Sequence, residues 1–581
     1  MDIKYWSNNF NGSRNWEDIL MSKKQWLVLI LILILGIWLR FWQLGETPKG
    51  FYLDEAALGY NAYSIMETGR DEFGKSWPLL FRSFGDFKAP IYTYLLIPIY
   101  KVIGMSVWST RVLSAMMGVI GIWFCFWLVK NLSKKTNLGL ITALLMTISP
   151  WHIIFSKTSY ETNVALTFLL IALWSFYKFK ENKRWLILTA LMAALSFLTY
   201  HSERVIVPLV FLVLFIKERK EIFEKKNIKT LIMAVLFGLV LILPTIKLMA
   251  TPGFLSRLNS LSILSNKVKS SWGFNENLNG WKNNVFNNQI ILQVKEFGSL
   301  YTSYFSPRYL FRLGDPGPRS SYPDLAPFLF WQLPFLIIGI IWLFKKTIKE
   351  NNKEIKFLII LMMVVSPIPA SITRDPFSSI RALPLVLPLT ILVAVGINKL
   401  IEKYKKLGII ILIGLIIWSS GKIYLSVFKF NDYFRGWSWE EGIEDMVKQI
   451  KESDLPIVID NSRGEIYSQV LFFTKANPKT YQENNFEVKE NEYYNDMTRN
   501  KIKKIDEITI RGIVWGEDIL KEQILVGDTL SINEKQMEEH CLSLVFEIKD
   551  REGKVIYRGV KTHPKDKEKF KGISPCLITT P

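Results

Sequence analysis

Long runs of apolar residues constrain the fold of this chain more than any other feature. Two of the clearest are QWLVLILILILGIWL, which begins at Gln25, and KLGIIILIGLIIW, which begins at Lys406. A helix needs about 20 predominantly apolar residues to cross the hydrocarbon core of a bilayer, and these runs approach that length. Hydrophobic residues make up 49% of the 581-residue chain, too large a share for an ordinary soluble enzyme. The sequence therefore predicts a polytopic α-helical membrane protein.

Apolar segments follow one another along most of the chain. They lie at about 25–44, 90–105, 110–130, 138–156, 161–178, 185–200, 204–217, 230–249, 326–345, 357–373, 380–398 and 407–428. Twelve complete crossings would return the chain to its starting side, yet only one segment follows the basic loop at 398–406, which favours the cytoplasm. We therefore expect an odd number of transmembrane helices, 11 or 13. Either one segment between 90 and 156 fails to cross, or one segment is wrongly split or merged.

The net charge of +20 comes largely from short loops between the apolar segments. These loops are 178–184, 217–229, 345–356 and 398–406. Basic loops stay on the cytoplasmic side of a membrane, where anionic lipid headgroups supply the counter-charge. We therefore expect membrane lipids as partners and no nucleic acid.

The pattern predicts three regions in a multi-pass protein of the plasma membrane. Residues 1–24 form a cytoplasmic segment, and residues 25–430 form the transmembrane domain, with external loops at 45–89 and 250–325. The first apolar run lacks a small-residue cleavage pattern, so we expect an uncleaved helix. Residues 431–581 form a soluble, extracytoplasmic domain with a structural or acceptor-facing role.

Alternating and helical patterns indicate that the C-terminal domain is α/β. Helices are expected at 437–453 and 464–475, and strands at 455–460, 541–550 and 553–560. Among the three cysteines, Cys125 lies in an apolar run and is expected to be a buried hydrophobe. Cys541 and Cys576 could form a disulfide if the domain faces outward, and their spacing makes zinc binding unlikely.

Acidic residues mark the boundary after the first apolar run. Asp54 and Glu55 stand in FYLDEAALGYNA, and Asp86 stands in SFGDFKAPIY just before the next apolar run. Two adjacent carboxylates at a membrane boundary are costly to desolvate, and a general base that accepts a proton from a hydroxyl would account for them. An acidic pair that favours the dipole of a following helix is the alternative, and it stays open for Glu55. Asp86 could equally cap the next helix.

Further ionisable residues lie in segments that the topology brings to the outer face. They are Lys88, His152, Glu161, His201, Glu203, Arg204, Arg374, Asp375 and Arg381. A lipid phosphate is the natural partner for the cations in this set. Other roles remain open: Lys88 could extend to the interface, Glu161 and Arg204 could pair with each other, and the histidines could be satisfied structural residues.

The stretch from Phe51 to Leu96 resembles the first external loop of GT-C glycosyltransferases that use lipid-linked sugars. Protein O-mannosyltransferases and the bacterial aminoarabinose transferases are the nearest branch. The motifs that carry the resemblance are Asp54-Glu55, the turn Met66–Gly69, and Lys88-Ala89-Pro90-Ile91-Tyr92. The resemblance covers roughly residues 25–430 and excludes the C-terminal domain. Ala89 replaces the usual first proline, and Glu161 stands where relatives often carry Asp.

The resemblance implies a GT-C fold and an inverting transfer from a polyprenyl-phosphate sugar, such as a hexose like mannose, to an acceptor hydroxyl. Asp54 would be the base, with Glu55 beside it as a second catalytic carboxylate. Lys88, Arg204 and Arg381 would bind the donor phosphate, while Asp86, Tyr92, Glu161 and His201 would contact the substrate. No metal or other cofactor is required by this logic, because side-chain cations can stabilise the leaving phosphate. The acceptor, a protein, lipid or glycan, does not follow from the fold.

Two functions from other classes remain as alternatives. A transporter or lipid-linked-glycan flippase would share the polytopic architecture without making a bond. Transporters typically show inverted repeats and charged or broken helices near the bilayer midplane, whereas the charges here lie at helix ends. A non-catalytic relative that binds glycan through its outer domain is the third possibility, against which Asp54 argues.

Overall fold

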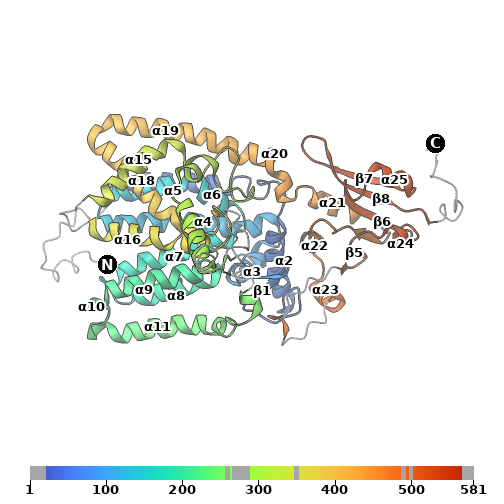
Figure 1. The fold of residues 1–581 in the computed structure, drawn as a ribbon, viewed down its shortest axis with the longest axis horizontal. Helices are drawn as coiled ribbons and strands as arrows, with labels where there is room; N and C mark the ends of the chain where they lie inside the picture. Colours follow the sequence, from blue (N-terminus) through green and yellow to red (C-terminus); the bar gives the residue numbers. More distant parts are fainter. Residues whose placement is uncertain are drawn as a thin grey trace.

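The structure is a computed structural model in which a bundle of long helices is joined to a smaller domain built on a β-sheet (Figure 1). It describes residues 21–255, 262–264, 288–345, 352–485, 492–495 and 502–564. Most of the expected cytoplasmic segment 1–24, and much of the expected external loop 250–325, lie outside these residues.

Every apolar segment expected from the sequence contains a helix. The helices of the bundle are α1 (Lys23–Phe41), α4 (Val107–Ser133), α5 (Thr136–Thr147), α6 (Pro150–Lys157), α7 (Glu161–Lys178), α8 (Trp185–Thr199), α9 (Glu203–Lys217), α10 (Arg219–Ile222), α11 (Lys225–Ile246), α15 (Leu333–Phe344), α16 (Lys353–Val365), α17 (Ile368–Ser371), α18 (Val386–Tyr404) and α19 (Lys406–Leu425). Six of the described helices are long and apolar enough to span a bilayer, and the bent pair α5–α6 would add a seventh. The expectation of a multi-pass helical membrane protein is confirmed.

Helix α3 (Ile91–Ile103) does not run from one end of the bundle to the other. It follows the strand that ends at Lys88 and precedes α4, whose first turns lie beside the loop after α1. The hydroxyls of Tyr92 and Tyr100, more than two turns apart, both bond to Thr110 of α4, at 2.8 and 2.5 Å. Helix α3 therefore begins and ends at the same end of the bundle. This agrees with the expectation that one segment between 90 and 156 fails to cross. Apolar composition did not reveal which segment it is, because it does not show the direction in which a short helix runs.

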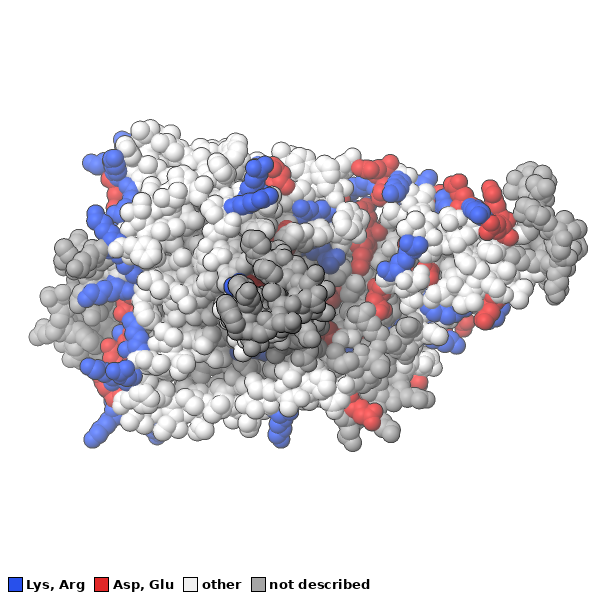
Figure 2. Space-filling view, in the orientation of Figure 1, with Lys and Arg blue, Asp and Glu red and all other residues white. Residues whose placement is uncertain are grey.

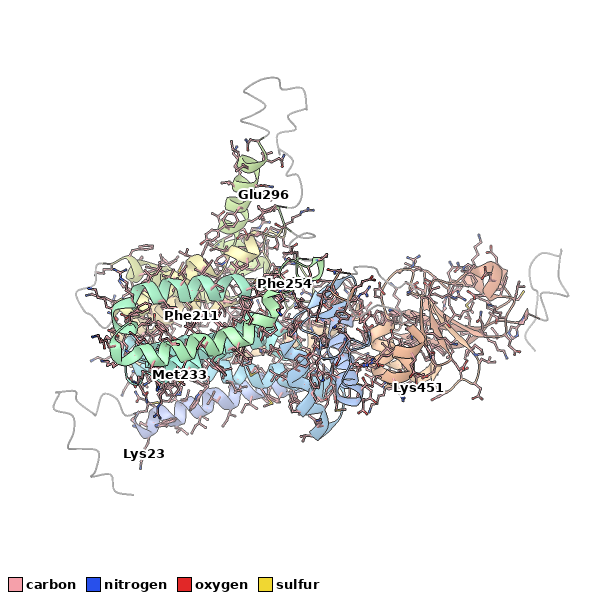
Figure 3. All side chains as sticks on the ribbon, turned by 90° about the horizontal axis from the view of Figure 1, so that it is seen from below. Lys23, Phe211, Met233, Phe254, Glu296 and Lys451 are labelled. Atoms are coloured by element: carbon pink, nitrogen blue, oxygen red, sulfur yellow. The ribbon has the colours of Figure 1, made fainter. Side chains whose placement is uncertain are left out.

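The two ends of the bundle differ in charge. Lysine and arginine side chains gather at the end farthest from the sheet domain (Figure 2), where ion pairs join the loops: Lys180 to Glu218 at 2.7 Å and Lys135 to Glu402 at 3.0 Å. Lys23, at the start of α1, lies at this same end, and Lys451 of the sheet domain lies at the other (Figure 3). Lys23 and Lys451 thus lie at opposite ends of the bundle, which agrees with an odd number of crossings between them, while the count of 11 or 13 stays a prediction.

The C-terminal domain holds a six-stranded mixed sheet in the order β4-β5-β3-β6-β8-β7. The strands are β3 (Ile457–Ile459), β4 (Lys503–Ile505), β5 (Ile508–Ile510), β6 (Ile524–Asp528), β7 (Ser543–Lys549) and β8 (Val555–Lys561), and the helices are α21 (Ile443–Ile450), α22 (Tyr467–Thr474), α23 (Pro478–Asn485), α24 (Trp515–Asp518) and α25 (Glu534–Glu539). Strand β3 pairs in parallel with β5 and β6, and its fully buried Ile-Val-Ile run is typical of a central parallel strand. The expected elements at α21, β3, α22, β7 and β8 are present.

Several short elements lie between the helices of the bundle and between the bundle and the C-terminal domain. They are η3 (Tyr309–Leu313), η4 (Phe330–Gln332), η6 (Leu383–Leu385), η7 (Ser426–Phe430), α20 (Asn431–Arg435) and η8 (Gly436–Trp439), while α14 (Gln289–Ser303) projects from the side of the bundle (Figure 3). Cys541 is disulfide-bonded and Cys125 is a free, buried thiol. Cys576 lies outside the described residues, so its expected pairing with Cys541 stays a prediction.

Helix α2 (Leu53–Thr68) lies across the end of the bundle, between the bundle and the sheet domain (Figure 1). It belongs to two hydrophobic cores. Tyr60 packs with strands and helices of the C-terminal domain, whereas Ala56, Leu58 and Ala62 pack with α3 and α4. The hairpin of β1 (Phe81–Ser83) and β2 (Asp86–Lys88) follows α2 and returns the chain to it. Helix α2 is therefore the structural junction of the molecule.

Candidate functional site

Asp54 and Lys88 form an ion pair at the start of α2. Lys88 Nζ lies 2.7 Å from Asp54 Oδ1, and it also donates to the backbone oxygen of Asp54 at 3.3 Å. The Lys88 side chain is 7% exposed, whereas that of Asp54 is 41% exposed. The first turn of a helix favours a carboxylate, and strand β2 carries the ammonium group to it. The structure thus brings an accessible carboxylate and a buried cation, both predicted from the sequence, into direct contact.

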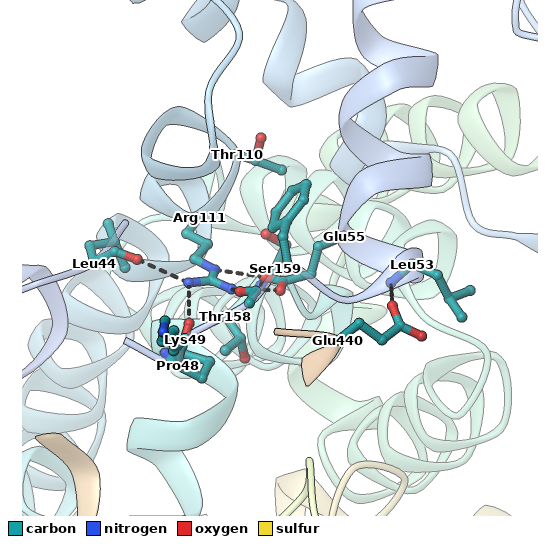
Figure 4. Close-up of polar contacts among 12 residues, drawn as sticks. Leu44, Pro48, Lys49, Leu53, Glu55, Thr110, Arg111, Thr158, Ser159 and Glu440 are labelled. Atoms are coloured by element: carbon teal, nitrogen blue, oxygen red, sulfur yellow. Dashed lines mark hydrogen bonds and ion pairs between the residues drawn. The ribbon is translucent and has the colours of Figure 1, made fainter. Parts of the chain in front are cut away.

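Glu55 has a different environment from its neighbour. Its two oxygens accept from Arg111 Nε at 3.0 Å and from Arg111 Nη2 at 2.9 Å (Figure 4). The backbone N–H of Ser159 donates to the same carboxylate at 2.9 Å. Both side chains of the ion pair are buried. These contacts commit Glu55 to anchoring α2, and they give no support to its expected part as a second catalytic carboxylate.

Arg111 is a residue that the sequence analysis missed. Its guanidinium also donates to the backbone oxygens of Leu44 at 3.3 Å, Pro48 at 3.1 Å and Gly50 at 2.8 Å. It therefore holds the loop between α1 and α2 as well as α2 itself. An arginine inside an expected membrane segment is costly unless it is paired, and that cost was the available signal.

His201 contacts the strand that carries Lys88, and Arg204 lies over a ring that packs near this strand. The ring of His201 is hydrogen-bonded through Nε2 to the backbone oxygen of Phe87, at 3.1 Å. The guanidinium of Arg204 lies over the ring of Phe254, 4.2 Å from its centroid, and Phe254 packs in the same cluster as Phe87. His201 therefore contacts Phe87, the residue before Lys88, and Arg204 lies over Phe254, which packs in the same cluster as Phe87.

The structure gives weaker support to the remaining residues expected to contact the substrate. Tyr92 is fully buried and bonded to α4, so the structure puts it in the packing beneath the site rather than on its surface. Asp86 begins β2, opposite Ser83 in the hairpin. Glu161 is the first residue of α7, and it is partly exposed. Of these, Asp86 and Glu161 stay predictions, and the expectation of direct substrate contact by Tyr92 does not fit its burial.

Arg381 is engaged within its own loop. It forms an ion pair with Asp375 and donates to Thr373 Oγ1 at 3.1 Å. The preceding residue, Ile380, accepts a hydrogen bond from Thr162 of α7 at 2.9 Å, so this loop packs beside Glu161. The third expected phosphate-binding cation therefore already has a carboxylate partner.

Two residues from distant parts of the chain lie beside Asp54 without having been predicted. Glu440 accepts a hydrogen bond through Oε2 from the backbone N–H of Leu53, at 2.8 Å (Figure 4). The guanidinium of Arg319 lies 3.7 Å from the ring centroid of Tyr52. Burial raises the pKa of Glu440 to about 7, with the charge of Asp54 adding to the rise. No local pattern could have placed a residue 387 positions away at the start of α2.

A second polar cluster ties the turn after α2 to the C-terminal domain. Asp71 Oδ1 accepts from the backbone N–H groups of Phe73 at 3.0 Å and Lys75 at 2.8 Å, and its other oxygen accepts from the Tyr493 hydroxyl. Burial raises the pKa of Asp71 to about 7, and burial raises the pKa of the adjacent Glu72 to about 7 as well. Both carboxyl groups thus keep their protons to a higher pH than exposed carboxyl groups do.

This cluster predicts a pH dependence of stability. An unfolded aspartate ionises near pH 4, while folded Asp71 ionises near 7, so the folded state binds the extra proton between these values and loses stability as pH rises through that window. We expect the melting temperature in detergent to fall from pH 5 to pH 8. Asp71→Asn should reduce that fall by at least about 2 °C, whereas Glu67→Gln, at an exposed position of α2, should not. An unchanged slope in the Asp71 variant would contradict the assignment.

The chain is similar in sequence and in fold to known proteins. Residues 87–247 match a family model described as dolichyl-phosphate-mannose-protein mannosyltransferase, a match that starts after Asp54. No curated protein sequence matches the chain. The crystal structure of ArnT from Cupriavidus metallidurans bound to undecaprenyl phosphate superposes with a TM-score of 0.51 at 12% identity, covering 93% of this chain and 98% of that one.

A second solved structure is similar over a smaller part. The Archaeoglobus fulgidus oligosaccharyltransferase in its apo form gives a TM-score of 0.45 at 12% identity, covering 77% of this chain and 63% of that one. The ArnT structure, at 12% identity, shows a shared fold over nearly the full length of both chains.

Proposed function

From the GT-C fold, which this chain has as expected, we propose that it is a membrane glycosyltransferase that moves a sugar from a polyprenyl-phosphate donor to an acceptor hydroxyl. The contact between Asp54 and Lys88 carries the proposal, because it joins an accessible carboxylate to a buried ammonium group at the end of the bundle. Such a transfer needs a base for the acceptor and a cation for the leaving phosphate.

The chemistry follows from these two groups. Asp54 takes the proton from the acceptor hydroxyl as the oxygen attacks the anomeric carbon of the sugar. The bond from that carbon to the phosphate oxygen breaks on the opposite face, and the electron pair leaves with the polyprenyl phosphate, which inverts the carbon. A phosphate leaving group needs no protonation, so one base is sufficient. Lys88, beside Asp54, neutralises the charge that develops on the phosphate.

An apolar cavity supports a lipid-linked donor. A cavity of about 260 Å³ lies between α8, α9 and α11, and Val207, Pro208 and Phe211 line it along α9. Helices α9 and α11, marked by Phe211 and Met233, run side by side here (Figure 3). Arg204 stands one turn before Val207, so a phosphate held at Arg204 and Lys88 would leave its isoprenoid chain beside this cavity. ArnT, which has the same fold, was crystallised with undecaprenyl phosphate.

Sugar, acceptor and orientation complete the proposal. The family description favours mannose or a similar hexose, and the acceptor is a protein, lipid or glycan. The basic end of the bundle would face the cytoplasm, so the reaction would take place on the outer face of the plasma membrane beside the C-terminal domain. Among the described residues no group of three or more His, Cys, Asp or Glu could hold a metal ion. That no cofactor is needed stays an expectation from the chemistry.

Replacement of Lys88 tests this proposal. We expect membranes that contain the wild-type protein to consume undecaprenyl-phosphate [³H]mannose, or the matching glucose donor, and to label a non-lipid or glycolipid acceptor. Lys88→Gln removes a charge-assisted contact with the phosphate and should slow donor consumption about 10- to 100-fold. Lys101→Gln, at an exposed lysine of α3, serves as the control and should leave the rate unchanged.

The alternative makes a different prediction in the same membranes. If folded wild-type protein moves the labelled donor across the bilayer but leaves its sugar–phosphate bond intact in the presence of envelope extract, the protein is a flippase and the transferase proposal is wrong. If Lys88→Gln matches the wild-type rate, Lys88 does not bind the donor phosphate.

A further inference from the structure

The backbone just before Asp54 is held by residues of the C-terminal region. The N–H of Leu53 donates to Glu440 Oε2 at 2.8 Å, and the carbonyl of Leu53 accepts from Ser468 Oγ at 3.1 Å. Gln469 donates through Nε2 to the carbonyl of Phe51, at 3.4 Å, and also to Glu440. Both backbone polar groups of Leu53, the residue before Asp54, are therefore bonded to another part of the chain.

Aromatic side chains also pack between the start of α2 and helix α22. The ring of Phe51 lies 4.6 Å from that of Phe472 and 5.9 Å from that of Phe473, measured between centroids. One and a half turns into α2, a β-carbon on Gly59 would lie 2.6 Å from the Phe472 ring, so only glycine permits this approach. Helix α22 thus packs along the first turns of α2 rather than touching a single point.

Glu440 adopts an unfavourable backbone conformation to make its contact. Its φ of 59° and ψ of 47° lie in the left-handed region, which costs a residue with a β-carbon about 1–2 kcal/mol. Tyr52, the N-cap of α2, supplies no side-chain cap. The carboxylate of Glu440 therefore satisfies a donor at the positive end of the helix dipole, where an anion is favoured.

We propose that Glu440 is a positioning residue, which with Gln469 fixes the first turn of α2 so that Asp54 is held against Lys88. The C-terminal domain would then contribute to catalysis through geometry, without touching the reacting atoms. The catalytic part of this inference rests on the proposed function, whereas the ordering of α2 by Glu440 does not.

Glu440→Gly and Glu440→Gln separate the carboxylate from the backbone. Glycine accepts the left-handed conformation, so the first variant removes only the side chain. Glutamine keeps an oxygen that can accept from Leu53. We expect amide hydrogen exchange in purified protein to rise about 10-fold in the peptide covering 51–58 for Glu440→Gly, and to change little for Glu440→Gln. Glu452→Gln, at an exposed site after α21, is the control.

Donor consumption provides the second readout. Glu440→Gly should lower the maximal rate with undecaprenyl-phosphate [³H]mannose about 10-fold at an unchanged KM for the donor, because Lys88 and the apolar cavity remain, and Glu440→Gln should restore most of it. Unchanged exchange in Glu440→Gly overturns the positioning role. Raised exchange with an unchanged maximal rate overturns its link to Asp54. If the wild type consumes no donor, the proposed function fails, and the exchange data alone decide whether Glu440 orders this turn.

Discussion

Asp54→Asn is expected to lower the initial rate of donor consumption by about 10²–10⁴-fold, the usual contribution of a general base. Asparagine keeps the shape of the side chain and its place in the first turn of α2, but it cannot take the proton of the acceptor hydroxyl. Lys88 would keep its hydrogen bond to the Asp54 backbone oxygen, now 3.3 Å long, so the local structure should persist. The rate is measured in membranes that carry equal amounts of folded protein.

The control for this substitution is Glu67→Gln, which removes an exposed carboxylate from the far end of the same helix. It should leave the rate unchanged. If Asp54→Asn is as active as the wild type, Asp54 serves only the helix dipole and the base lies elsewhere. If both variants lose activity together with their thermal stability, the loss is one of folding and says nothing for a base at Asp54.

Glu55→Gln is expected to destabilise the protein by about 3–5 kcal/mol, since it leaves the charge of Arg111 buried without its carboxylate. The yield of folded, detergent-purified protein and its melting temperature should both fall sharply. Arg111→Lys should do nearly the same, because one ammonium cannot replace the contacts that a guanidinium makes with Glu55 and with three backbone oxygens.

The same substitution tests the catalytic role that the sequence motif predicts for Glu55. If Glu55→Gln folds with a normal melting temperature but loses donor consumption, the carboxylate is catalytic and its anchoring role is wrong. Combining Glu55→Gln with Arg111→Met should cost less than the sum of the two single changes, since the double variant leaves no unpaired charge in the packing.

Apolar length and charge placement predicted much of the fold. The helices, the opposite locations of Lys23 and Lys451, and several elements of the C-terminal domain follow from periodicity and from the positive-inside rule. The direction of α3 did not, because a 13-residue apolar helix can pack along a membrane surface or cross part of it with the same composition. Strands β4 and β5, at three residues each, were also too short to carry a detectable alternation.

Some residues of the candidate site could be predicted from the sequence and others could not. Asp54 and Lys88 stand in two motifs of the same external loop, so the family resemblance could assign both to one site, and the structure places them in contact. Arg111 could have been predicted, because an arginine inside an expected membrane segment is costly unless it is paired. Glu440 and Arg319 left none, since their positions beside Asp54 depend on how distant segments fold back onto α2. Contacts of that kind are tertiary, and no local pattern encodes them.

The distance along the chain between Leu53 and Glu440 also has a temporal meaning. The two residues are 387 positions apart, so at about 5–20 residues per second a ribosome adds Glu440 some 20–80 s after α2 has been made. During that interval α2, the helix that carries Asp54, lacks its hydrogen bond from Leu53 to Glu440. If Glu440 orders the helix as proposed, the proposed transferase reaches full activity only after the C-terminal domain has been made and has packed onto α2.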